Sequence, residues 1–531
     1  MRQLFAGIDC STQSCKLVVI DLDARKVIYT DVVNYDQDLP RYHTVNGVIS
    51  GLDEGVSESD PNMWIDALEM LFQRLAQSDL SPREIKAMSV SGQQHGLVCL
   101  DRDGNLSRHR SKLWNDFSTR AECEQLTEFV GGARQMIAEV GNTQRTGYTA
   151  GKILHFARHE PMAFERTTTC FLVHNFVNWY LTGGKHGGVR VMEPGDTSGM
   201  ALWHPATKSW SDKLLHFISP NLKEKLPPVL PSDQFIGNIS PDLVKRFGFD
   251  PNCKIDAGSG DNMYGAIGTG NVVPGIVTVS LGTSGTAYSF MEQPYIDPEG
   301  EIAAFCDSTG HYLPLLCVSN LANGYNALLQ QFNLSHEQFN RIADQTPPGC
   351  QGRLVIPWYA GERTPDVPLA APVYFGFGLD DFRPEWLCRA VLEGHVLNLY
   401  DGFQRMPVTA HEIRLTGGLS RSEAWCQTIA DIFEATVVPV EGEGAALGAA
   451  LHAAWVYRKQ QDPATSLVDL ISPFVLLQEN RRKVPIAKHV QRYRILKKLF
   501  HSLSRLVRRQ PSDEDPFELR NQLIQTTTSQ D

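Results

Sequence analysis

The chain has 531 residues, of which 42% are hydrophobic and 21% are charged, and its formal net charge is -11. This length exceeds what one ordinary hydrophobic core can serve, so it predicts two large domains with some additional material. The composition is that of a globular protein, and the acidic balance argues against nucleic acid as a partner.

The cysteine pattern and the first residues indicate the compartment. The 11 cysteines run from Cys10 to Cys426 with neither CxxC pairs nor Cys/His clusters of zinc-site spacing, which fits reduced thiols. The chain reaches Asp9 without the apolar stretch of a secretory signal. No uninterrupted apolar run has the roughly 20 residues that a bilayer span requires. These features predict a cytoplasmic protein without a transmembrane segment.

The first predicted element is a β-hairpin near the N-terminus. Its two apolar runs, residues 4–8 and 17–20, enclose a polar turn that begins at Asp9. The turn offers hydroxyl, amide and backbone N–H groups that suit phosphate oxygens, although the same pattern is typical of a turn without a ligand. Asp9, at the end of the strand, could hold a metal ion or its water. The candidate phosphate-binding residues of this turn are Thr12, Gln13 and Ser14.

An amphipathic helix is expected directly after Asp60 and Pro61, which suit the N-cap and the first helical position. Its apolar face comprises Trp64, Leu68, Leu71, Phe72 and Leu75. Helices of this kind alternating with strands predict an α/β fold.

Residues 256–262 place Asp261 after flexible glycines, at the end of a predicted strand. This position suits a catalytic base, but an aspartate after a glycine turn is also typical of a helix N-cap. The glycines and proline of residues 265–274 follow immediately and predict a hinge between two domains.

A second strand-turn-strand unit covers residues 275–290 and has the same pattern of strand, polar turn and strand as the first hairpin. Two glycines in its turn would let the backbone approach a ligand closely. The candidate phosphate-binding residues here are Gly282, Thr283 and Ser284. Two such units predict two similar domains that together hold phosphate groups.

A third glycine cluster, residues 416–422, lies between a predicted strand and a predicted helix. Such a junction suits an anion or a nucleotide, with a tight packing turn as an equal alternative. The run of small residues 444–450 favours close helix packing over a flat ligand.

The chain becomes strongly basic after about residue 460, and residues 493–507 show helical spacing of apolar side chains. We expect a basic amphipathic helix that packs on the protein's own surface. A partner protein or an anionic membrane face remains the alternative.

Taken together, these motifs resemble the FGGY family of carbohydrate kinases, within the actin-like ATPase superfamily, over about residues 4–458. The opening phosphate motif is matched by residues 7–14, with Ser11 where glycine is commoner, and the catalytic Gly-x-x-Asp-Asn motif by residues 258–262. The second phosphate turn is matched by residues 281–284. The adenosine turn is matched by Gly417, Gly418 and Ser422.

The resemblance implies an α/β fold of two actin-like ATPase (ribonuclease H-like) domains with a cleft between them. Residues 1–268 would form the N-terminal domain with the sugar site, the first phosphate turn and the catalytic aspartate. Residues 269–460 would form the ATP-binding C-terminal domain, and residues 461–531 a basic extension outside the family core. A homodimer is left open.

The resemblance also implies the roles of the site residues. Asp261 would be the general base that accepts the proton of a sugar hydroxyl, and Asp9 would fix Mg²⁺, through water. Asn262 and His95 would orient the sugar, and the three glycine and hydroxyl turns would hold ATP. Closure of the two domains would exclude water as a competing acceptor.

The sugar is indicated by two further segments. Residues 92–96 resemble the substrate loop of the xylulokinases within the family, and residues 114–116 resemble a segment that lines the sugar. Gln94, His95 and Trp114 are therefore expected to contact D-xylulose, which would be converted to D-xylulose 5-phosphate. Arg145 has no clear match to a substrate-binding arginine of the family and is not assigned a role.

Two alternatives stand beside this prediction. A kinase of another ketose or polyol, such as ribulose, would share every catalytic part. A non-catalytic actin-like nucleotide-binding scaffold would need neither the sugar loop nor the Asp261–Asn262 pair.

Overall fold

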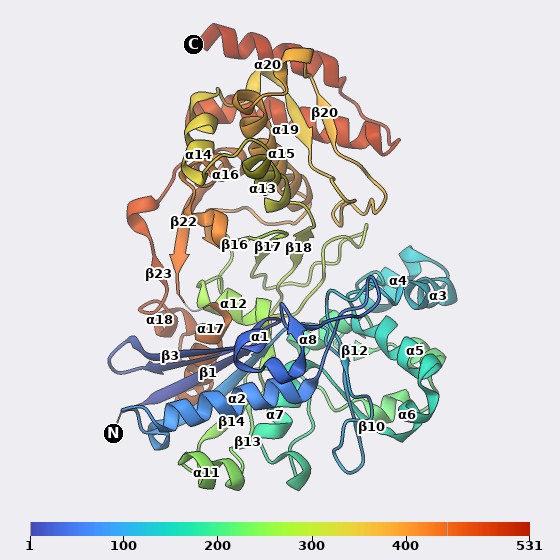
Figure 1. The fold of residues 1–531 in the computed structure, drawn as a ribbon, viewed down its shortest axis with the longest axis vertical. Coiled ribbons are helices and arrows are strands. Elements are labelled where there is room, and N and C mark those ends of the chain that lie inside the picture. Colours follow the sequence, from blue (N-terminus) through green and yellow to red (C-terminus); the bar gives the residue numbers. More distant parts are fainter. Residues whose placement is uncertain (1, 443, 531) are drawn as a thin grey trace. The chain divides into compact units, whose positions relative to one another are not determined.

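The computed structural model describes residues 2–442 and 444–530, which form two compact units (Figure 1). The first unit comprises Met1–Val273, Phe290–Pro314 and Gly442–Val475. The second unit comprises Pro274–Ser289, Leu315–Glu441 and Leu476–Asp531. This division differs from the contiguous ranges expected with boundaries at residues 268 and 460, because two later segments of the chain pack with the first unit.

The first unit is built on a sheet with the strand order β13-β14-β7-β1-β2-β3. The bounds are β1 (Leu4–Cys10), β2 (Ser14–Asp21), β3 (Lys26–Asn34), β7 (Ile85–Gly92), β13 (Phe235–Asn238) and β14 (Lys254–Asp256). Strands β1, β2 and β3 form an antiparallel meander, which confirms the first predicted hairpin. Strand β7 pairs in parallel with β1, with β14 and with the short β15 (Ser259–Gly260).

Alternate residues of β1 point to opposite faces of this sheet, as the period of a strand requires. Leu4, Ala6 and Ile8 join one core cluster with the apolar face of α2 (Pro61–Ala76). Phe5 joins a second cluster with α12 (Asp261–Gly268) and α17 (Gly444–Gln461). Helix α2 confirms the predicted amphipathic helix, and the Asp60 side chain accepts a hydrogen bond from the backbone N–H of Asn62 at its N-terminus.

Glycines let α17 lie directly on its neighbours. A Cβ atom on Gly7 would stand 1.9 Å from the carbonyl oxygen of Ala446, and one on Gly448 would stand 1.8 Å from the carbonyl oxygen of Tyr264 in α12. Such separations are far below van der Waals contact, so neither position admits a side chain. The expected close helix packing of the run 444–450 is therefore confirmed, and it explains why this late segment belongs to the first unit.

The second unit repeats this plan. Its sheet has the order β18-β17-β16-β21-β22-β23, with β16, β17 and β18 antiparallel and β16, β21 and β22 parallel. The bounds are β16 (Ile276–Leu281), β17 (Gly285–Ser289), β18 (Leu315–Val318), β21 (Glu412–Thr416), β22 (Thr436–Glu441) and β23 (Leu476–Leu477). The β16–β17 hairpin and the prediction of two similar domains are confirmed.

The basic segment near the C-terminus forms α19 (Ala487–Val507), which packs on α15 (Pro384–Phe403) and α16 (Glu423–Phe433). Its buried apolar residues include Tyr493, Leu496, Phe500 and Leu503, whereas Val507 is exposed. Arg494 and Lys497 both form ion pairs with Glu434 of the same unit. The helix therefore packs on the protein's own surface, as expected.

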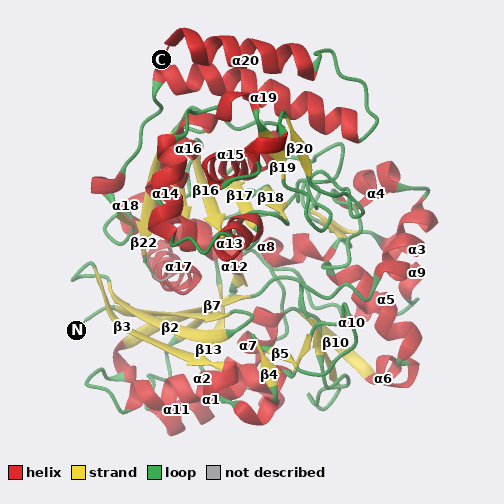
Figure 2. Cartoon of the chain, turned by 45° about the horizontal axis from the view of Figure 1, so that its top comes forward, coloured by secondary structure: helices red, strands yellow, loops and turns green. Residues whose placement is uncertain are grey.

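The remaining elements complete the two α/β units (Figure 2). The other helices of the first unit are α1 (Tyr35–Asp38), α3 (Arg120–Val130), α4 (Ala133–Val140), α5 (Thr149–His159), α6 (Pro161–Arg166), α7 (Val173–Leu181), α8 (Pro194–Thr197), α9 (Asp212–Ile218), α10 (Leu222–Lys225), α11 (Pro241–Phe247) and α18 (Leu467–Ile471). Those of the second unit are α13 (Ala322–Gln331), α14 (His336–Gln345) and α20 (Pro516–Gln530). The short strands are β4 (Thr44–Val45), β5 (Val48–Ile49), β6 (Glu58–Ser59), β8 (Val98–Asp101), β9 (Ser111–Lys112), β10 (Thr167–Phe171), β11 (Trp203–His204), β12 (Ser209–Trp210), β19 (Leu354–Ile356) and β20 (Val373–Phe375).

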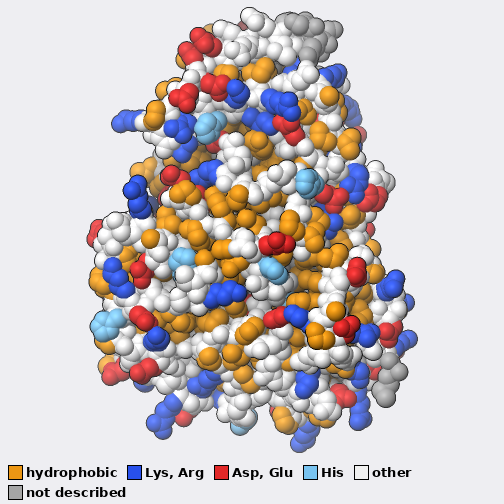
Figure 3. Space-filling model, turned by 180° about the vertical axis from the view of Figure 1, so that it is seen from behind, with side chains coloured by type: hydrophobic (Ala, Val, Ile, Leu, Met, Phe, Trp, Pro, Cys, Tyr) orange, Lys and Arg blue, Asp and Glu red, His pale blue; other side chains and the backbone are white. Residues whose placement is uncertain are grey.

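The surface gives two further observations. Among residues 2–442 and 444–530, no helix combines the length and the apolarity that crossing a membrane would require. On the face shown in Figure 3, Lys and Arg side chains are interspersed with Asp and Glu rather than gathered in one basic patch.

Candidate functional site

The candidate site of the first unit lies at the carboxyl ends of its parallel strands. Asp9 near the end of β1 is in register with Ser91 of β7, and Gly92 at the end of β7 is in register with Gly260 of β15. Parallel strands deliver the residues that follow them to one edge of the sheet, which is the usual place of a ligand site in α/β folds. Asp9, the loop after Gly92 and Asp261 are therefore brought to one edge.

Asp261 is the first residue of α12, and the N-cap position is taken by Gly260, whose cap makes no side-chain hydrogen bond. The alternative interpretation of Asp261 as a helix N-cap is therefore not realised. Burial raises the pKa of Asp261 to about 7, and the negative charges of Asp9 and Asp196 act in the same direction. The carboxylate is held where its proton affinity is far above that of an ordinary aspartate.

Asp9 is the second carboxylate of this edge. Burial raises its pKa to about 6, and the hydrogen bond that its Oδ1 accepts from the Ser91 hydroxyl, at 2.7 Å, acts in the opposite direction. Two neighbouring acids with raised pKa values in one place are typical of a functional site.

Hydrogen bonds of two side-chain amides connect the segment 92–96 to Asp261. Asn262 Nδ2 donates to Gln94 Oε1 at 2.8 Å and to Asp261 Oδ1 at 2.9 Å. Gln94 is buried, and its Nε2 makes no hydrogen bond with any described residue. A buried amide donor without a partner is costly, so this atom is a ready contact for a ligand oxygen.

His95 follows in a left-handed backbone conformation, with a φ of 67°. Side-chain-bearing residues adopt this region rarely, and such strain concentrates at functional sites. The imidazole packs between Tyr148 and Phe305, at ring-centroid distances of 4.9 and 5.8 Å. The backbone carbonyl oxygen of His95 accepts a hydrogen bond from Lys152 Nζ at 2.8 Å. The chain thus holds His95 firmly from both its ring and its backbone.

Two residues of this neighbourhood were missed by the sequence analysis. Asp196, in the short helix α8, lies 3.1 Å from His174 Nδ1 through its Oδ2, and its charge contributes to the raised pKa of Asp261. Lys152 is fully buried in α5, and burial lowers its pKa to about 7. The Glu-Pro-Gly-Asp sequence at residues 193–196 could have indicated Asp196 as a candidate. The sequence around Lys152 contains no comparable motif.

Trp114 lies beside the first turn. Its indole Nε1 donates to Thr12 Oγ1 at 2.9 Å, and Thr12 in turn donates to Gln93 Oε1 at 3.3 Å. Trp114 is 36% exposed, so part of this residue is accessible from solvent. Gln13 is exposed at the tip of the turn, and Ser14 closes the turn through its carbonyl oxygen, which accepts from the Ser11 hydroxyl.

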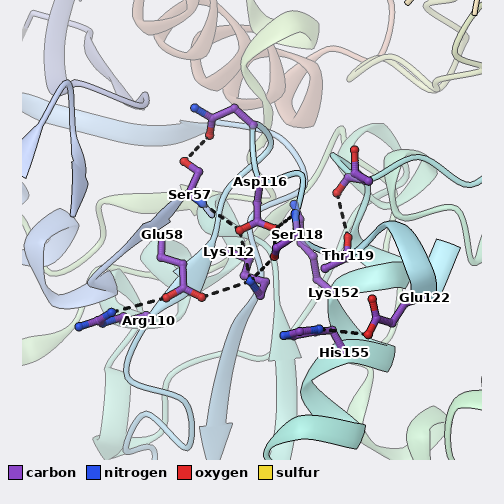
Figure 4. A network of polar contacts seen from close by, with 12 residues as sticks. Ser57, Glu58, Arg110, Lys112, Asp116, Ser118, Thr119, Glu122, Lys152 and His155 are labelled. Carbon is purple, nitrogen blue, oxygen red and sulfur yellow. Dashed lines mark hydrogen bonds and ion pairs between the residues drawn. The ribbon is translucent and has the colours of Figure 1, made fainter. Parts of the chain in front are cut away.

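The residues after Trp114 hold the loop together. Asp116 is fully buried, and its Oδ2 accepts from the backbone N–H of Ser57 at 2.9 Å and from Lys112 Nζ at 3.2 Å (Figure 4). Arg145, to which no role was assigned, donates to the carbonyl oxygen of Gly300 at 3.1 Å.

The second unit brings its candidate residues to the equivalent edge of its own sheet. Ser280 of β16 is in register with Thr416 of β21, so the turn with Gly282, Thr283 and Ser284 and the turn with Gly417 and Gly418 follow adjacent strands. A Cβ atom on Gly417 would stand 2.6 Å from the carbonyl oxygen of Leu281, which shows how closely the two turns approach.

Gly418 and Ser422 differ in what surrounds them. A Cβ atom on Gly418 would meet nothing within 4 Å, so there is open space beside its backbone. The Ser422 side chain caps α16 by accepting from the backbone N–H of Trp425, and it donates to Asn340 Oδ1 at 2.6 Å. Ser422 therefore has a structural role in starting the helix.

Two family models match the chain in succession. The N-terminal domain of the FGGY family of carbohydrate kinases matches residues 4–268, and the C-terminal domain of that family matches residues 265–457. A xylulose kinase of Haemophilus influenzae is 35% identical to the chain over 501 residues, which cover 92% of this chain and 97% of that protein.

Solved structures show the same fold. The xylulose kinase from Bifidobacterium adolescentis aligns with a TM-score of 0.78 and 26% identity, over 93% of this chain and 99% of that one. A gluconate kinase from Lactobacillus acidophilus aligns with a TM-score of 0.83 and 23% identity, over 96% and 98% of the two chains. The fold is thus similar to that of proteins named for different sugars and does not by itself choose between them.

Proposed function

Because the chain belongs to the FGGY family of carbohydrate kinases, we propose that it transfers the γ-phosphate of ATP to D-xylulose and forms D-xylulose 5-phosphate. The family establishes the coarser activity, which is phosphorylation of a sugar by ATP. The choice of D-xylulose is supported by the relatives named xylulose kinase. The observation that carries the proposal is the cluster of Asp261, Asn262, Gln94 and His95 at one sheet edge.

Asp261 is the general base of the proposed reaction. Its raised pKa makes it a stronger proton acceptor than an ordinary carboxylate while leaving much of it ionised near neutral pH. Asn262 holds Oδ1 through a hydrogen bond, and we assign proton acceptance to the other oxygen, Oδ2. As the terminal hydroxyl of the sugar attacks the γ-phosphate, its proton passes to this oxygen.

The sugar is bound by Gln94, His95 and Trp114. Gln94 Nε2, which has no hydrogen-bond partner among the described residues, would donate to a sugar oxygen, and the partly exposed Trp114 would cover an apolar carbohydrate face. The strained backbone of His95 is held by its neighbours, which supports a positioning role for its imidazole. Since alignment supplies much of the rate enhancement in phosphoryl transfer, rigid support of this loop matters for turnover.

The donor set of this edge fits a magnesium ion. Asp9 supplies a carboxylate oxygen, and Mg²⁺ prefers hard oxygen ligands together with water. Asp9 would hold the ion, through water, and the ion would neutralise charge on the phosphates of ATP when bound. In the first unit, Thr12, Gln13 and Ser14 are the proposed phosphate-binding residues. In the second unit, considered by itself, Gly282, Thr283 and Ser284 are the proposed phosphate-binding residues, and Gly417 and Gly418 the proposed adenosine-binding residues. Ser422 would contribute by capping the helix behind these glycines.

The substrate is tested with a panel of ketoses and polyols in an assay that couples ADP release to a visible signal. We expect the highest kcat/KM with D-xylulose and little ADP release without sugar. Robust turnover of D-ribulose, gluconate or glycerol without turnover of D-xylulose would overturn the choice of sugar. Asp261→Asn, assayed in parallel, distinguishes the catalysed reaction from contaminating activity.

A further inference from the structure

A second cluster of metal-ligating side chains lies on the helices α3 and α5, and the proposed reaction does not use it. His155 and His159 are four residues apart on α5 and therefore lie on one face of that helix. Glu122 of α3 faces them, and Figure 4 shows the Glu122 carboxylate and the His155 ring pointing toward each other. We propose that Glu122, His155 and His159 form a binding site for a zinc ion that joins α3 to α5.

The separations within the cluster fit tetrahedral zinc. One oxygen, Glu122 Oε1, lies 3.1 Å from His155 Nδ1 and 3.3 Å from His159 Nε2. Zinc binds nitrogen and carboxylate oxygen at about 2.0–2.2 Å, so neighbouring ligand atoms of a tetrahedral site stand about 3.3 Å apart. The ligand atoms of all three residues lie within 4.8 Å of one another. Small side-chain rotations would place all three at bonding distance from one ion.

The packing of α3 against α5 restricts the position of Glu122. A Cβ atom on Gly151 of α5 would stand 2.8 Å from the sulfur of Cys123 in α3, so the two helices touch one turn before the cluster. Glu122 is buried, with 5% of its surface exposed, and it therefore has little freedom. A site whose ligands are fixed by packing loses little conformational entropy when it binds an ion.

Charge also favours a cation at this point. Glu122 is a buried carboxylate whose described hydrogen-bond partners are the two imidazoles, and a buried carboxylate is costly without a cation. The nearby ammonium of Lys112 is already engaged by Glu58 and Asp116.

The ligand types select zinc over the magnesium that accompanies ATP. Two imidazoles and one carboxylate suit a borderline transition-metal ion, whereas Mg²⁺ prefers oxygen ligands alone. The His159 side chain is 59% exposed and gives an ion a path from solvent, with water as a fourth ligand.

Zinc binding is tested on the full chain after removal of metal with a chelator. The protein is titrated with ZnCl₂ against a chromogenic zinc indicator, in the presence of excess Mg²⁺ to protect the oxygen ligands at Asp9. We expect one zinc ion per chain in the wild type and at least tenfold weaker binding in Glu122→Gln, His155→Gln and His159→Gln. The matched control is His216→Gln, which removes an exposed histidine of α9 and should leave binding unchanged.

A thermal measurement keeps the proposal falsifiable if a variant folds poorly. Zinc should raise the unfolding midpoint of the wild type and of His216→Gln, because a ligand that binds only the folded state stabilises it. The exposed substitution His159→Gln should preserve the metal-free midpoint and abolish the zinc-induced rise. No zinc binding by the wild type, or equal binding by the wild type and all three ligand variants, would overturn the site. Neither readout depends on kinase activity, so failure here leaves the proposed reaction untouched.

Discussion

The sheets of the two units match strand for strand, with β3-β2-β1-β7-β14 in the first and β18-β17-β16-β21-β22 in the second. Each even carries one further antiparallel strand at the same edge, β13 and β23. The residues after the parallel strands differ, however. The first sheet ends in the acids Asp9 and Asp261, and the second in the glycine turns around Gly282 and Gly417. One scaffold thus presents two carboxylates in one unit and glycine turns in the other.

The sharpest test of this comparison removes the proposed base, Asp261, from the first unit. Asp261→Asn keeps the size of the side chain and one acceptor oxygen for Asn262, but the amide cannot accept the proton, so kcat should fall about 10³-fold. ADP release in the presence of D-xylulose measures the loss, and circular dichroism checks the fold. Activity within tenfold of wild type would assign the base elsewhere.

The pH dependence of kcat/KM in the wild type tests the role of the Asp261 carboxylate without substituting that residue. Asp261 must be ionised to act, and its pKa is raised to about 7, so kcat/KM should fall about tenfold per pH unit below pH 7 and level off above it. Asp196→Asn removes one of the charges that raise this pKa and should move the acid limb to lower pH. An acid limb near pH 4 in the wild type would contradict the assignment.

The same raised pKa predicts a cost in stability. A carboxyl group with a folded-state pKa above its unfolded value of 3.8 stabilises the fold below pH 3.8, and this contribution is lost as pH rises through about 7. Asp261→Asn should therefore raise the free energy of unfolding at pH 8, on the order of 2 kcal/mol. Denaturant unfolding at pH 8 and at pH 5 measures it, and the gain should be smaller at pH 5.

A substitution in the sugar-binding segment of the first unit should have a smaller effect than the loss of Asp261. Gln94→Leu removes the Nε2 donor, which has no partner among the described residues, together with the Oε1 that accepts from Asn262. It should raise KM for the sugar about tenfold, with KM for ATP nearly unchanged. Steady-state kinetics with each substrate varied in turn gives both values. An equal rise in both KM values would show a general disturbance of the site.

The smallest effect is expected in the second unit. Gly418→Ala adds a methyl group where the chain leaves open space, so the fold should persist while KM for ATP rises about two- to fivefold if adenosine approaches this backbone. Gly417→Ala is the contrasting variant, because its Cβ would collide with the carbonyl oxygen of Leu281 and its φ is 86°. That variant should lose thermal stability instead.

Local patterns predicted the parts of this molecule that local chemistry determines. Both hairpins, α2 and the glycine turns are readable because apolar periodicity and turn residues act over a few positions. Asp261 alone could not be distinguished from a helix cap, and only its position among the family motifs favoured a base. Asp196 and Lys152 escaped prediction because their importance arises from long-range neighbours, the carboxylate of Asp261 and the carbonyl of His95. The packing of α17 in the first unit was not predicted for the same reason. Its small residues indicate that another element packs closely against the helix, but they do not identify that element.

That return of α17 has a consequence for how the molecule is made. The chain passes from one unit to the other five times, and the face of the first sheet beside Gly7 is covered only when residues 442–475 arrive. During synthesis, the N-terminal family segment that ends at residue 268 would therefore keep apolar surface exposed until most of the second unit has also been synthesised. A fragment cut at residue 268 would carry the same exposed face permanently, and it would aggregate rather than behave as an independent module.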